Sequence, residues 1–283
     1  MRPSLRTVLF LAPATAWLLC MLVLPLLVVV VVSFGERGAA GGYVPAFTLD
    51  NFANLGARWA PIRNTILMAP LGTVLCILIA YPLAYFLAIK ADPRWRTLLL
   101  ILVIVPFWTS ILIRSYAWIQ ILGGNGLPRL IAELGLPKPR IINTPFAVMV
   151  GIVYGYLPLM VFPIYVTLDK LDRRLLEAAA DLGSPPWRSF LQVTLPLSIA
   201  GVATGSMLVF ILLMGEFLIP QLLGGGKVFF VGNALVDLFL QSRNWPFGAA
   251  LAATLVLVML VTVTLYLRAI RRLGGGRDDV SLM

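Results

Sequence analysis

Long apolar runs alternate with short polar segments along the chain. A helix needs about 20 apolar residues to cross the hydrocarbon core of a membrane, and six of the runs are long enough. The expected spans lie near residues 8–32, 64–89, 97–122, 145–168, 197–222 and 247–270. Prolines occur inside several spans, where neighbouring helices and water can satisfy the freed backbone groups. The pattern therefore predicts an all-α integral membrane protein with six transmembrane helices.

The two ends of the chain need separate consideration. Arg2 and Arg6 precede the first run as in a signal peptide, but the run is about twice as long as a signal's apolar region and no small-residue cleavage site follows closely. We therefore expect a retained span. Loops 33–63 and 123–144 are too short to bury a core of their own, so residues 1–283 should form a single transmembrane domain. We expect the tail 274–283 to be disordered.

Lysines and arginines are distributed unevenly between the two sides. One side carries 13, the other 8, and Arg114 remains inside a span, which accounts for all 22. The richer side holds both termini and the short segment around Glu177. The positive-inside rule places this side in the cytoplasm, which predicts a multi-pass membrane protein with both termini in the cytoplasm.

Composition agrees with a membrane location. Hydrophobic residues make up 60% of the chain and charged residues 12%, whereas a soluble domain is about half apolar and a quarter charged. Lipid must therefore cover much of the surface. The net charge of +10 comes from residues between apolar runs, which favours membrane orientation and gives no reason to expect a nucleic-acid partner.

Several kinds of chemistry lack the residues they require. The chain has no histidine, and its two cysteines, Cys20 and Cys76, lie inside apolar runs. We therefore expect no zinc site, disulfide framework or histidine-based catalytic triad. The run Gly224–Lys227 lacks the spacing and hydroxyl of a phosphate-binding loop. The sequence predicts a non-enzymatic protein with no catalytic residues, metal or cofactor.

The polar segment 170–196 has the features of a helical hairpin. A short helix is expected over Asp172–Leu182, with Glu177 and Asp181 four residues apart on one polar face. Its apolar stripe comprises Leu175, Leu176, Ala179 and Leu182. Gly183 suits the left-handed position that ends a helix. Ser184, followed by two prolines, is expected to cap a second helix.

This segment also fits a longer pattern. The pattern is Glu-Ala-Ala, three residues, Gly, nine residues, Ile or Val, any residue, Leu-Pro, and it is filled by Glu177, Ala178, Ala179, Gly183, Val193, Leu195 and Pro196. It resembles the cytoplasmic loop by which membrane subunits of binding-protein-dependent ABC importers hold their ATPase. The resemblance makes Glu177, Ala178, Ala179, Asp181 and Gly183 candidate coupling residues. An interfacial helix pair without a partner is the alternative.

Other segments are similar to the spermidine/putrescine-type permease family, and the resemblance covers roughly residues 5–272. They are Pro106–Ser110, Arg114–Trp118, Gly215–Phe217, Pro220–Gly225 and Asn244–Ala250. One departure is the Ser-Pro-Pro that follows Gly183, where the family more often has alanine and no paired prolines.

The resemblance implies a type I ABC importer permease fold, a location in a bacterial cytoplasmic (inner) membrane and a set of partners. These are cytoplasmic ATPase subunits, a second permease subunit that we expect to be a different but similar chain, an extracytoplasmic solute-binding protein and membrane lipid. Polyamine is the first expectation for the solute. Another organic amine, an opine, a phosphonate, ferric iron and thiosulfate remain alternatives. A secondary transporter, a membrane enzyme and a non-transporting anchor are competing interpretations that lack the expected polar groups or leave the Glu177 segment unexplained.

Candidate residues for the solute path lie on the outer halves of three spans. They are Trp108, Arg114, Tyr116, Trp118, Tyr154, Tyr156 and Glu216. Helical rise places Arg114 and Glu216 at similar depth, roughly 9–12 Å below the outer boundary. Three interpretations stay open for these charges: a buried ion pair, an outer gate in which Glu216 meets a solute amine, or an arginine that extends to the interface. The aromatic residues would line the path or form an interfacial belt.

Overall fold

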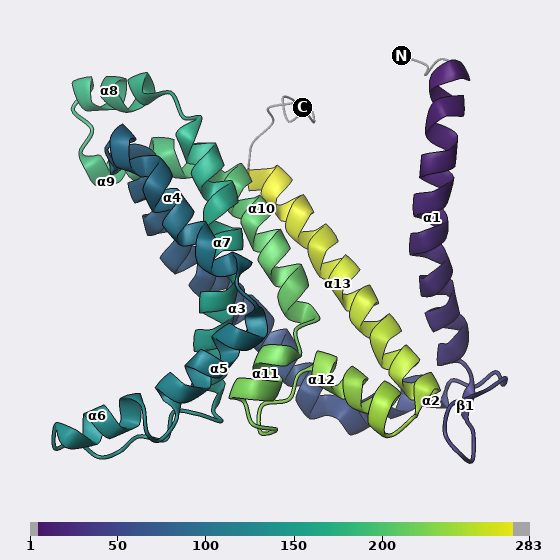
Figure 1. Cartoon of the computed structure of the whole chain (residues 1–283). Helices are drawn as coiled ribbons and strands as arrows, with labels where there is room; N and C mark the ends of the chain where they lie inside the picture. Colours follow the sequence, from purple (N-terminus) through teal and green to yellow (C-terminus); the bar gives the residue numbers. More distant parts are fainter. Residues whose placement is uncertain (1–4, 274–283) are drawn as a thin grey trace. The chain divides into compact units, whose positions relative to one another are not determined.

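The computed structural model describes residues 5–273, so the expected disorder of residues 274–283 concerns a segment outside the described residues. The chain divides into two compact units. In the described part, the first unit comprises residues 5–59 and 234–258, and the second comprises 60–233 and 259–273. Figure 1 follows the helices of both along the sequence.

The second unit contains most of the helices. They are α3 (Trp59–Tyr85), the π-helical turn η2 (Phe86–Lys90), α4 (Pro93–Trp108), α5 (Ile111–Leu122), α6 (Leu127–Glu133), α7 (Pro145–Asp169), α8 (Arg173–Asp181), α9 (Pro186–Ser189), the π-helical turn η3 (Phe190–Thr194), α10 (Leu195–Met214), α11 (Leu218–Leu223), the start of α12 (Val231–Val236) and the end of α13 (Trp245–Leu273).

The first unit contains two apolar helical segments, α1 (Leu5–Ser33) and the first half of α13, together with the loop that follows α1. It also contains β1 (Glu36–Arg37), β2 (Tyr43–Val44), α2 (Asp50–Ala53), the 3₁₀ turn η1 (Asn54–Arg58) and the π-helical turn η4 (Asp237–Gln241). The two strands pair antiparallel, with Glu36 opposite Val44. This two-residue ribbon is a small addition to the helical fold expected from the sequence.

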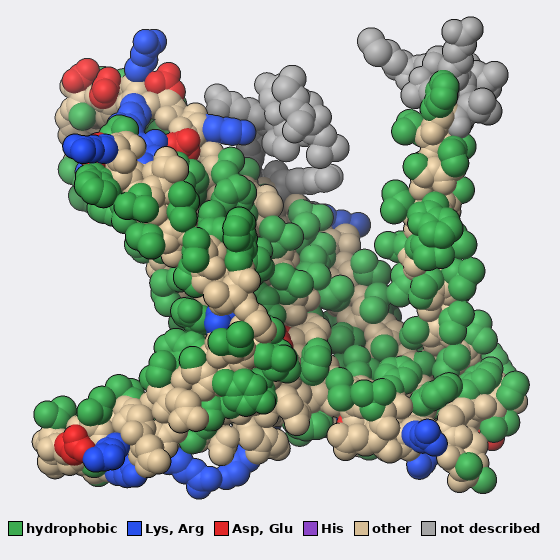
Figure 2. All heavy atoms as spheres, in the orientation of Figure 1, with side chains coloured by type: hydrophobic (Ala, Val, Ile, Leu, Met, Phe, Trp, Pro, Cys, Tyr) green, Lys and Arg blue, Asp and Glu red, His purple; other side chains and the backbone are tan. Residues whose placement is uncertain are grey.

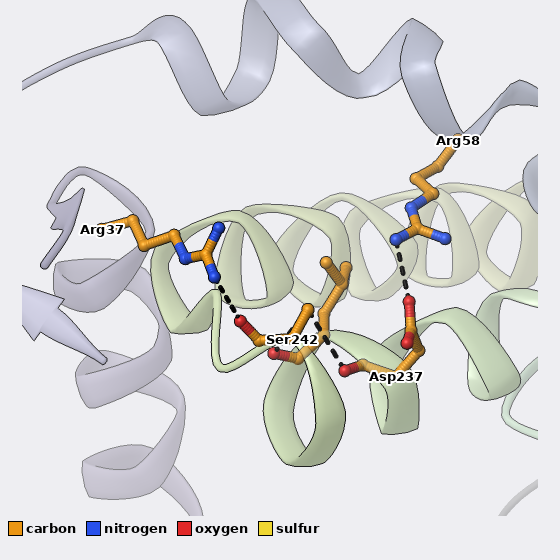
Figure 3. A network of polar contacts seen from close by, with 5 residues as sticks. Arg37, Arg58, Asp237 and Ser242 are labelled. Atoms are coloured by element: carbon orange, nitrogen blue, oxygen red, sulfur yellow. Dashed lines mark hydrogen bonds and ion pairs between the residues drawn. The ribbon is translucent and has the colours of Figure 1, made fainter. Parts of the chain in front are cut away.

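Polar contacts join the loop that follows α1 to η4 and to the turn just before α13. The Arg58 guanidinium lies 2.8 Å from the Asp237 carboxylate, and Arg37 donates a hydrogen bond to the Ser242 carbonyl at 2.7 Å (Figure 3). The Asn51 amide donates to the carbonyls of Ser33 and Gly35 at 3.0 and 2.8 Å. Backbone groups that leave regular structure are thereby satisfied by side chains.

Among residues 5–273, five helices are long and apolar enough to cross a membrane, and there are six if a bent pair of helices counts as one span. The five are Phe10–Ser33, Asp50–Lys90, Pro145–Asp169, Pro186–Met214 and Trp245–Ile270. The pair consists of α4 with α5 and α6, whose axes differ by 93°. The third apolar run is therefore not one straight helix: Thr109 and Ser110 adopt extended ψ angles of 152° and 133°, three and four residues after Pro106.

The fifth apolar run also differs from the expected range 197–222. Its helix begins earlier, because α9, η3 and α10 are continuous from Pro186, and ends at Met214. Gly215 and Glu216 form a break before α11. The argument from helical rise therefore does not apply to Glu216, because Glu216 is not in a helix that runs to Leu222, and its depth relative to Arg114 stays a prediction.

Close packing of α7 against α10 forms the centre of the second unit. Gly201 and Gly205 are four residues apart on α10, and both face α7. A Cβ at Gly201 would lie 2.6 Å from the Pro163 carbonyl and 2.5 Å from the Thr167 hydroxyl. Small residues at this spacing let two membrane helices approach closely, so side chains such as Met160 and Ile164 become fully buried.

Replacing Gly201 with alanine should destabilise this packing. Gly201→Ala forces backbone of α7 away, and overpacking of this kind costs about 1–3 kcal/mol. Thermal unfolding of the purified protein in nanodiscs measures the loss. Gly155→Ala on α7 is the matched control, because its Cβ would lie 3.6 Å from Ile219 in ordinary contact. Equal melting temperatures for the two variants would contradict the close approach.

Candidate coupling surface and solute path

The helical hairpin around Glu177 has a well-defined turn. The Asp172 side chain accepts a hydrogen bond from the Arg174 amide at 3.0 Å and so caps the start of α8. At the other end, the amides of Gly183 and Ser184 donate to the carbonyls of Ala180 and Ala179 at 2.9 and 3.0 Å. This paired arrangement requires a left-handed residue after the helix, and Gly183 has φ of +75°.

The second helix of the hairpin starts differently from the prediction. The residue before α9 is Pro185, with Pro186 in the first turn, and no side chain caps this end. The expectation that Ser184 caps the helix is therefore wrong. Proline's fixed φ and missing N–H suit a first turn without a side-chain cap.

The outer surface of the hairpin combines charged and apolar side chains. Glu177, Ala178 and Asp181 are exposed, and Ala179 is half-buried. Leu182 and Trp187 are exposed by 88% and 63%. Figure 2 shows acidic and basic side chains gathered at this end of the second unit, around α8. Nothing in the described chain lies within 4 Å of a Cβ built at Gly183, so the positive φ alone favours glycine there.

Contacts missed by the sequence analysis connect the hairpin to the spans. Phe190, in η3, packs edge-on against Tyr81 and Tyr85 of α3 with ring centres 5.6 and 5.8 Å apart. Arg173 of α8 donates to the Ala88 carbonyl of η2 at 3.4 Å. Both α8 and the segment that continues α9 therefore contact the same end of α3 and its π-helical extension.

An ion pair ties the start of α4 to the end of α7. The Arg96 guanidinium and the Asp169 carboxylate are 2.7 Å apart, with side-chain exposures of 19% and 40%. Asp169 is the last residue of α7, shortly before the hairpin begins. The only hint in the sequence was an acid at the end of an apolar run followed by basic residues.

The second group of candidate residues centres on Glu216, which is 6% exposed. One of its oxygens accepts hydrogen bonds from the amides of Leu218 and Ile219 at 2.7 and 3.2 Å. The other accepts a hydrogen bond from the Tyr156 hydroxyl of α7. The carboxylate therefore fixes the first turn of α11 and joins it to α7, and charge-assisted bonds of this kind are the stronger ones.

Arg114 lies among aromatic rings of the same region. Its guanidinium carbon is 5.9 Å from the centre of the Phe107 ring and 6.0 Å from that of Tyr154. Its Nε is buried without a hydrogen-bond partner among the described residues. Ring faces attract a cation at this distance. No ion pair joins Arg114 to Glu216 in the described part of the chain, so the buried-pair interpretation does not apply to this conformation.

The five aromatic candidates separate into two groups. Trp118 and Tyr154 pack edge to face with centres 5.5 Å apart, and Tyr156 holds Glu216. Trp108 and Tyr116 are exposed by 83% and 58% and form no ring pair within residues 5–273. Arg114, Trp118, Tyr154, Tyr156 and Glu216 thus share the junction of α5, α7 and α11, whereas Trp108 and Tyr116 do not.

Asn233 reinforces this junction and was not anticipated from the sequence. Its amide donates to the Phe217 carbonyl at 2.6 Å and to Gln221 at 3.2 Å, while its oxygen accepts from the Phe230 amide. Thr65 of α3 accepts a bond from the Val231 amide at 2.9 Å. Non-helical backbone at this junction is thereby satisfied within the protein.

An apolar hollow lies elsewhere, between α3, α10 and the end of α13. It has a volume of about 280 Å³ and is lined in part by Val74, Phe210 and Tyr266. Its Thr73 and Ser206 hydroxyls donate to carbonyls of their own helices. The lining of the hollow is therefore mainly apolar and provides few groups that could bind a cationic solute.

Residues 7–274 match the family described as binding-protein-dependent transport system inner membrane component. The spermidine/putrescine transport system permease protein PotB of Haemophilus influenzae is 42% identical over 259 residues, which cover 90% of each chain. PotB of Escherichia coli K12 is 41% identical, covering 91% of this chain and 95% of its own. The inner membrane ABC transporter permease YdcU of E. coli K12 is 32% identical, covering 82% and 77%.

Solved structures agree in fold. A chain of a bacterial alginate ABC transporter, crystallised with its alginate-bound periplasmic protein, superposes with a TM-score of 0.76 at 17% identity over 94% of each chain. A second structure of an alginate importer gives 0.72. The predicted helical fold of an importer permease is confirmed. The chain belongs to the family of inner membrane components of binding-protein-dependent transport systems.

Proposed function

We propose that this chain is a permease subunit of an ATP-driven importer and forms half of the path for a polyamine such as spermidine or putrescine. The observation that carries the proposal is the identity of 41–42% to PotB proteins over nine-tenths of the chain. Hydrolysis of ATP belongs to separate subunits, because no phosphate-binding loop occurs in the sequence.

The proposed assembly sets the orientation of the chain. ATPase subunits bind on the cytoplasmic side at α8 and α9, and both termini lie on that side. A second, similar permease chain completes the path, and an extracytoplasmic binding protein delivers solute near α11. The basic segments flanking the inner ends of the spans support this orientation.

Coupling proceeds from the hairpin to α3. When ATP closes the ATPases, their movement displaces α8 and α9, which contact Ala88 through Arg173 and Tyr81 through Phe190. The spans then shift between two packings, as a bistable transporter requires. The exposed Glu177 offers a carboxylate to a basic groove, and the small Ala178 and Ala179 permit close approach.

Uptake by the reconstituted importer tests the function. The permease pair, ATPases and binding protein are placed in vesicles, and ATP-dependent uptake of labelled spermidine and putrescine is measured. Excess opine, phosphonate, thiosulfate or ferric iron serves as competitor. Strong uptake that the competitors leave unchanged would support a polyamine importer. Uptake of a competitor in place of polyamine would reject the polyamine assignment but keep the importer.

Substitutions in the hairpin should uncouple ATP hydrolysis from transport. Glu177→Lys reverses the charge offered to the ATPase, and Gly183→Val forces a β-branched residue to positive φ, a strain of about 1–3 kcal/mol. Both variants should insert normally but lose most uptake. Gly183→Asn is the control, because asparagine tolerates the left-handed region, and it should retain more uptake than Gly183→Val. Normal transport by both test variants would contradict the coupling role.

For the path, we propose that Glu216 controls the outer gate. Each of its oxygens already accepts hydrogen bonds in this conformation, one set from α11 and one from Tyr156. A solute amine can therefore bind the carboxylate only if the Tyr156 contact opens. If the solute amine replaces the Tyr156 hydroxyl as a donor to Glu216, binding of the cation would release α11 from α7. The rings of Trp118 and Tyr154 offer faces to the same cation.

The variant Glu216→Gln separates gating from simple support. Glutamine keeps an oxygen that can cap α11 but removes the charge that attracts an amine, so folding should persist while uptake falls. Vesicle uptake and thermal unfolding are measured side by side. Glu216→Ala is the structural reference, because it loses the cap as well and should unfold more easily. Full uptake by Glu216→Gln would leave the carboxylate with a structural role only.

The variant Tyr154→Ala tests the aromatic part of the path. Loss of the ring removes a face available to a cation, worth about 0.5–2 kcal/mol, so the solute concentration for half-maximal uptake should rise severalfold. Trp108→Ala is the control, because Trp108 is 83% exposed outside the junction. Equal kinetics for both variants would favour an interfacial belt over a path lining.

A further inference from the structure

The short helix α6 has an apolar stripe that its own chain leaves uncovered. Leu127, Leu130 and Leu134 follow one another at intervals of three and four residues, which places them on one side of a helix. They are exposed by 41%, 59% and 79%. A turn through Gly135, with φ of +80°, then presents Leu136, exposed by 58%.

The opposite side of α6 is polar. Arg129 and Glu133 are four residues apart, and their side chains form an ion pair of 2.9 Å with exposures of 66% and 57%. On the face shown in Figure 2, hydrophobic side chains gather along one edge of the α6 arm and charged ones along the other. The apolar edge is on the side towards the long helices α4 and α7, and the charged edge is on the far side.

The orientation of α6 fits a helix in the plane of a membrane surface. It follows Leu122, the last residue of α5, after four residues, and it runs crosswise to α7 within the second unit (Figure 1). A helix that lies crosswise at the end of a span meets the boundary between hydrocarbon and headgroups. An amphipathic helix binds there with its apolar face towards the acyl chains.

Basic residues beside α6 indicate the charge of the lipid. Segment 123–144 contains three basic residues, Arg129, Lys138 and Arg140, and one acid, Glu133, for a net charge of +2. Lys138 and Arg140 are exposed and form no ion pair within residues 5–273. Both line a hollow of about 210 Å³ with Gly124 and Pro128 at the base of α6. The hollow is therefore a cationic recess next to an apolar stripe.

We propose that α6 and its recess bind anionic phospholipid at the surface of the membrane. The leucine stripe lies on the acyl chains, and Lys138 and Arg140 hold the headgroup phosphate. Attraction of basic residues to an anionic surface adds to the apolar contact. The surface anchors the α5–α6 arm independently of which solute the importer carries.

A fluorescent label on α6 tests this placement. Cys20 is exposed and is replaced by alanine, whereas Cys76 is buried. Leu134→Cys is then labelled with an environment-sensitive dye in the whole importer, in phosphatidylcholine vesicles with and without phosphatidylglycerol. Ala132→Cys is the matched control, since two residues correspond to about 200° around a helix. We expect blue-shifted emission and quenching by brominated lipid at position 134 and little of either at 132.

A second comparison tests the charge. Lys138→Ala with Arg140→Ala should abolish the extra shift that phosphatidylglycerol causes at position 134, while the shift in phosphatidylcholine remains. Equal quenching at positions 132 and 134, or no dependence on phosphatidylglycerol, would overturn the proposal. A blue shift that appears only when the binding protein is added would also overturn it and would assign the stripe to a protein contact.

Discussion

Wherever this chain leaves a helix within the membrane, a protein side chain must satisfy the backbone groups that water cannot reach. This constraint explains how the junction of α5, α7 and α11 is built. Glu216 accepts bonds from two amides at the start of α11, Asn233 bonds the next carbonyl in the chain, and Thr65 accepts from the Val231 amide. An unsatisfied group in such surroundings costs several kcal/mol, so the break after Met214 exists only because these side chains are present. With the gating role proposed for it, Glu216 would therefore both close the path and stabilise the fold.

The opposite end of the second unit depends on packing together with the Arg96–Asp169 ion pair. Phe190 packs edge-on against two tyrosines of α3, and Arg173 donates a hydrogen bond to a carbonyl of η2. Further along the same helices, Gly201 allows α10 to approach the backbone of α7. A well-packed interface of this kind transmits displacement, because its side chains cannot compress. The two ends of the second unit thus differ: hydrogen bonds to non-helical backbone hold one end, whereas ring packing, close contact at glycines and the Arg96–Asp169 ion pair hold the other.

Sequence reasoning succeeded where a physical signal is local and failed where it depends on tertiary partners. Apolar length placed the long helices, and the need for a left-handed residue identified Gly183. The break at Glu216 was missed, because a carboxylate that caps a new helix looks in the sequence like one more polar residue inside an apolar run. Ser184 was assigned a capping role that two prolines made unnecessary. The contacts of Phe190 and Asn233 join residues more than ten positions apart, and no periodicity reveals them.

The two arms of the coupling hairpin are attached to the spans in different ways. On one side, α7 ends at Asp169 and three residues without helical structure precede α8. On the other, α9 continues through η3 into α10 as one helix of 29 residues from Pro186 to Met214. The first attachment is a short non-helical connection, whereas the second is a continuous helix. Rotation applied at Trp187 would be carried along this continuous helix to the glycine contacts of α10, whereas a force on α8 would reach the spans through the contact between Arg173 and Ala88.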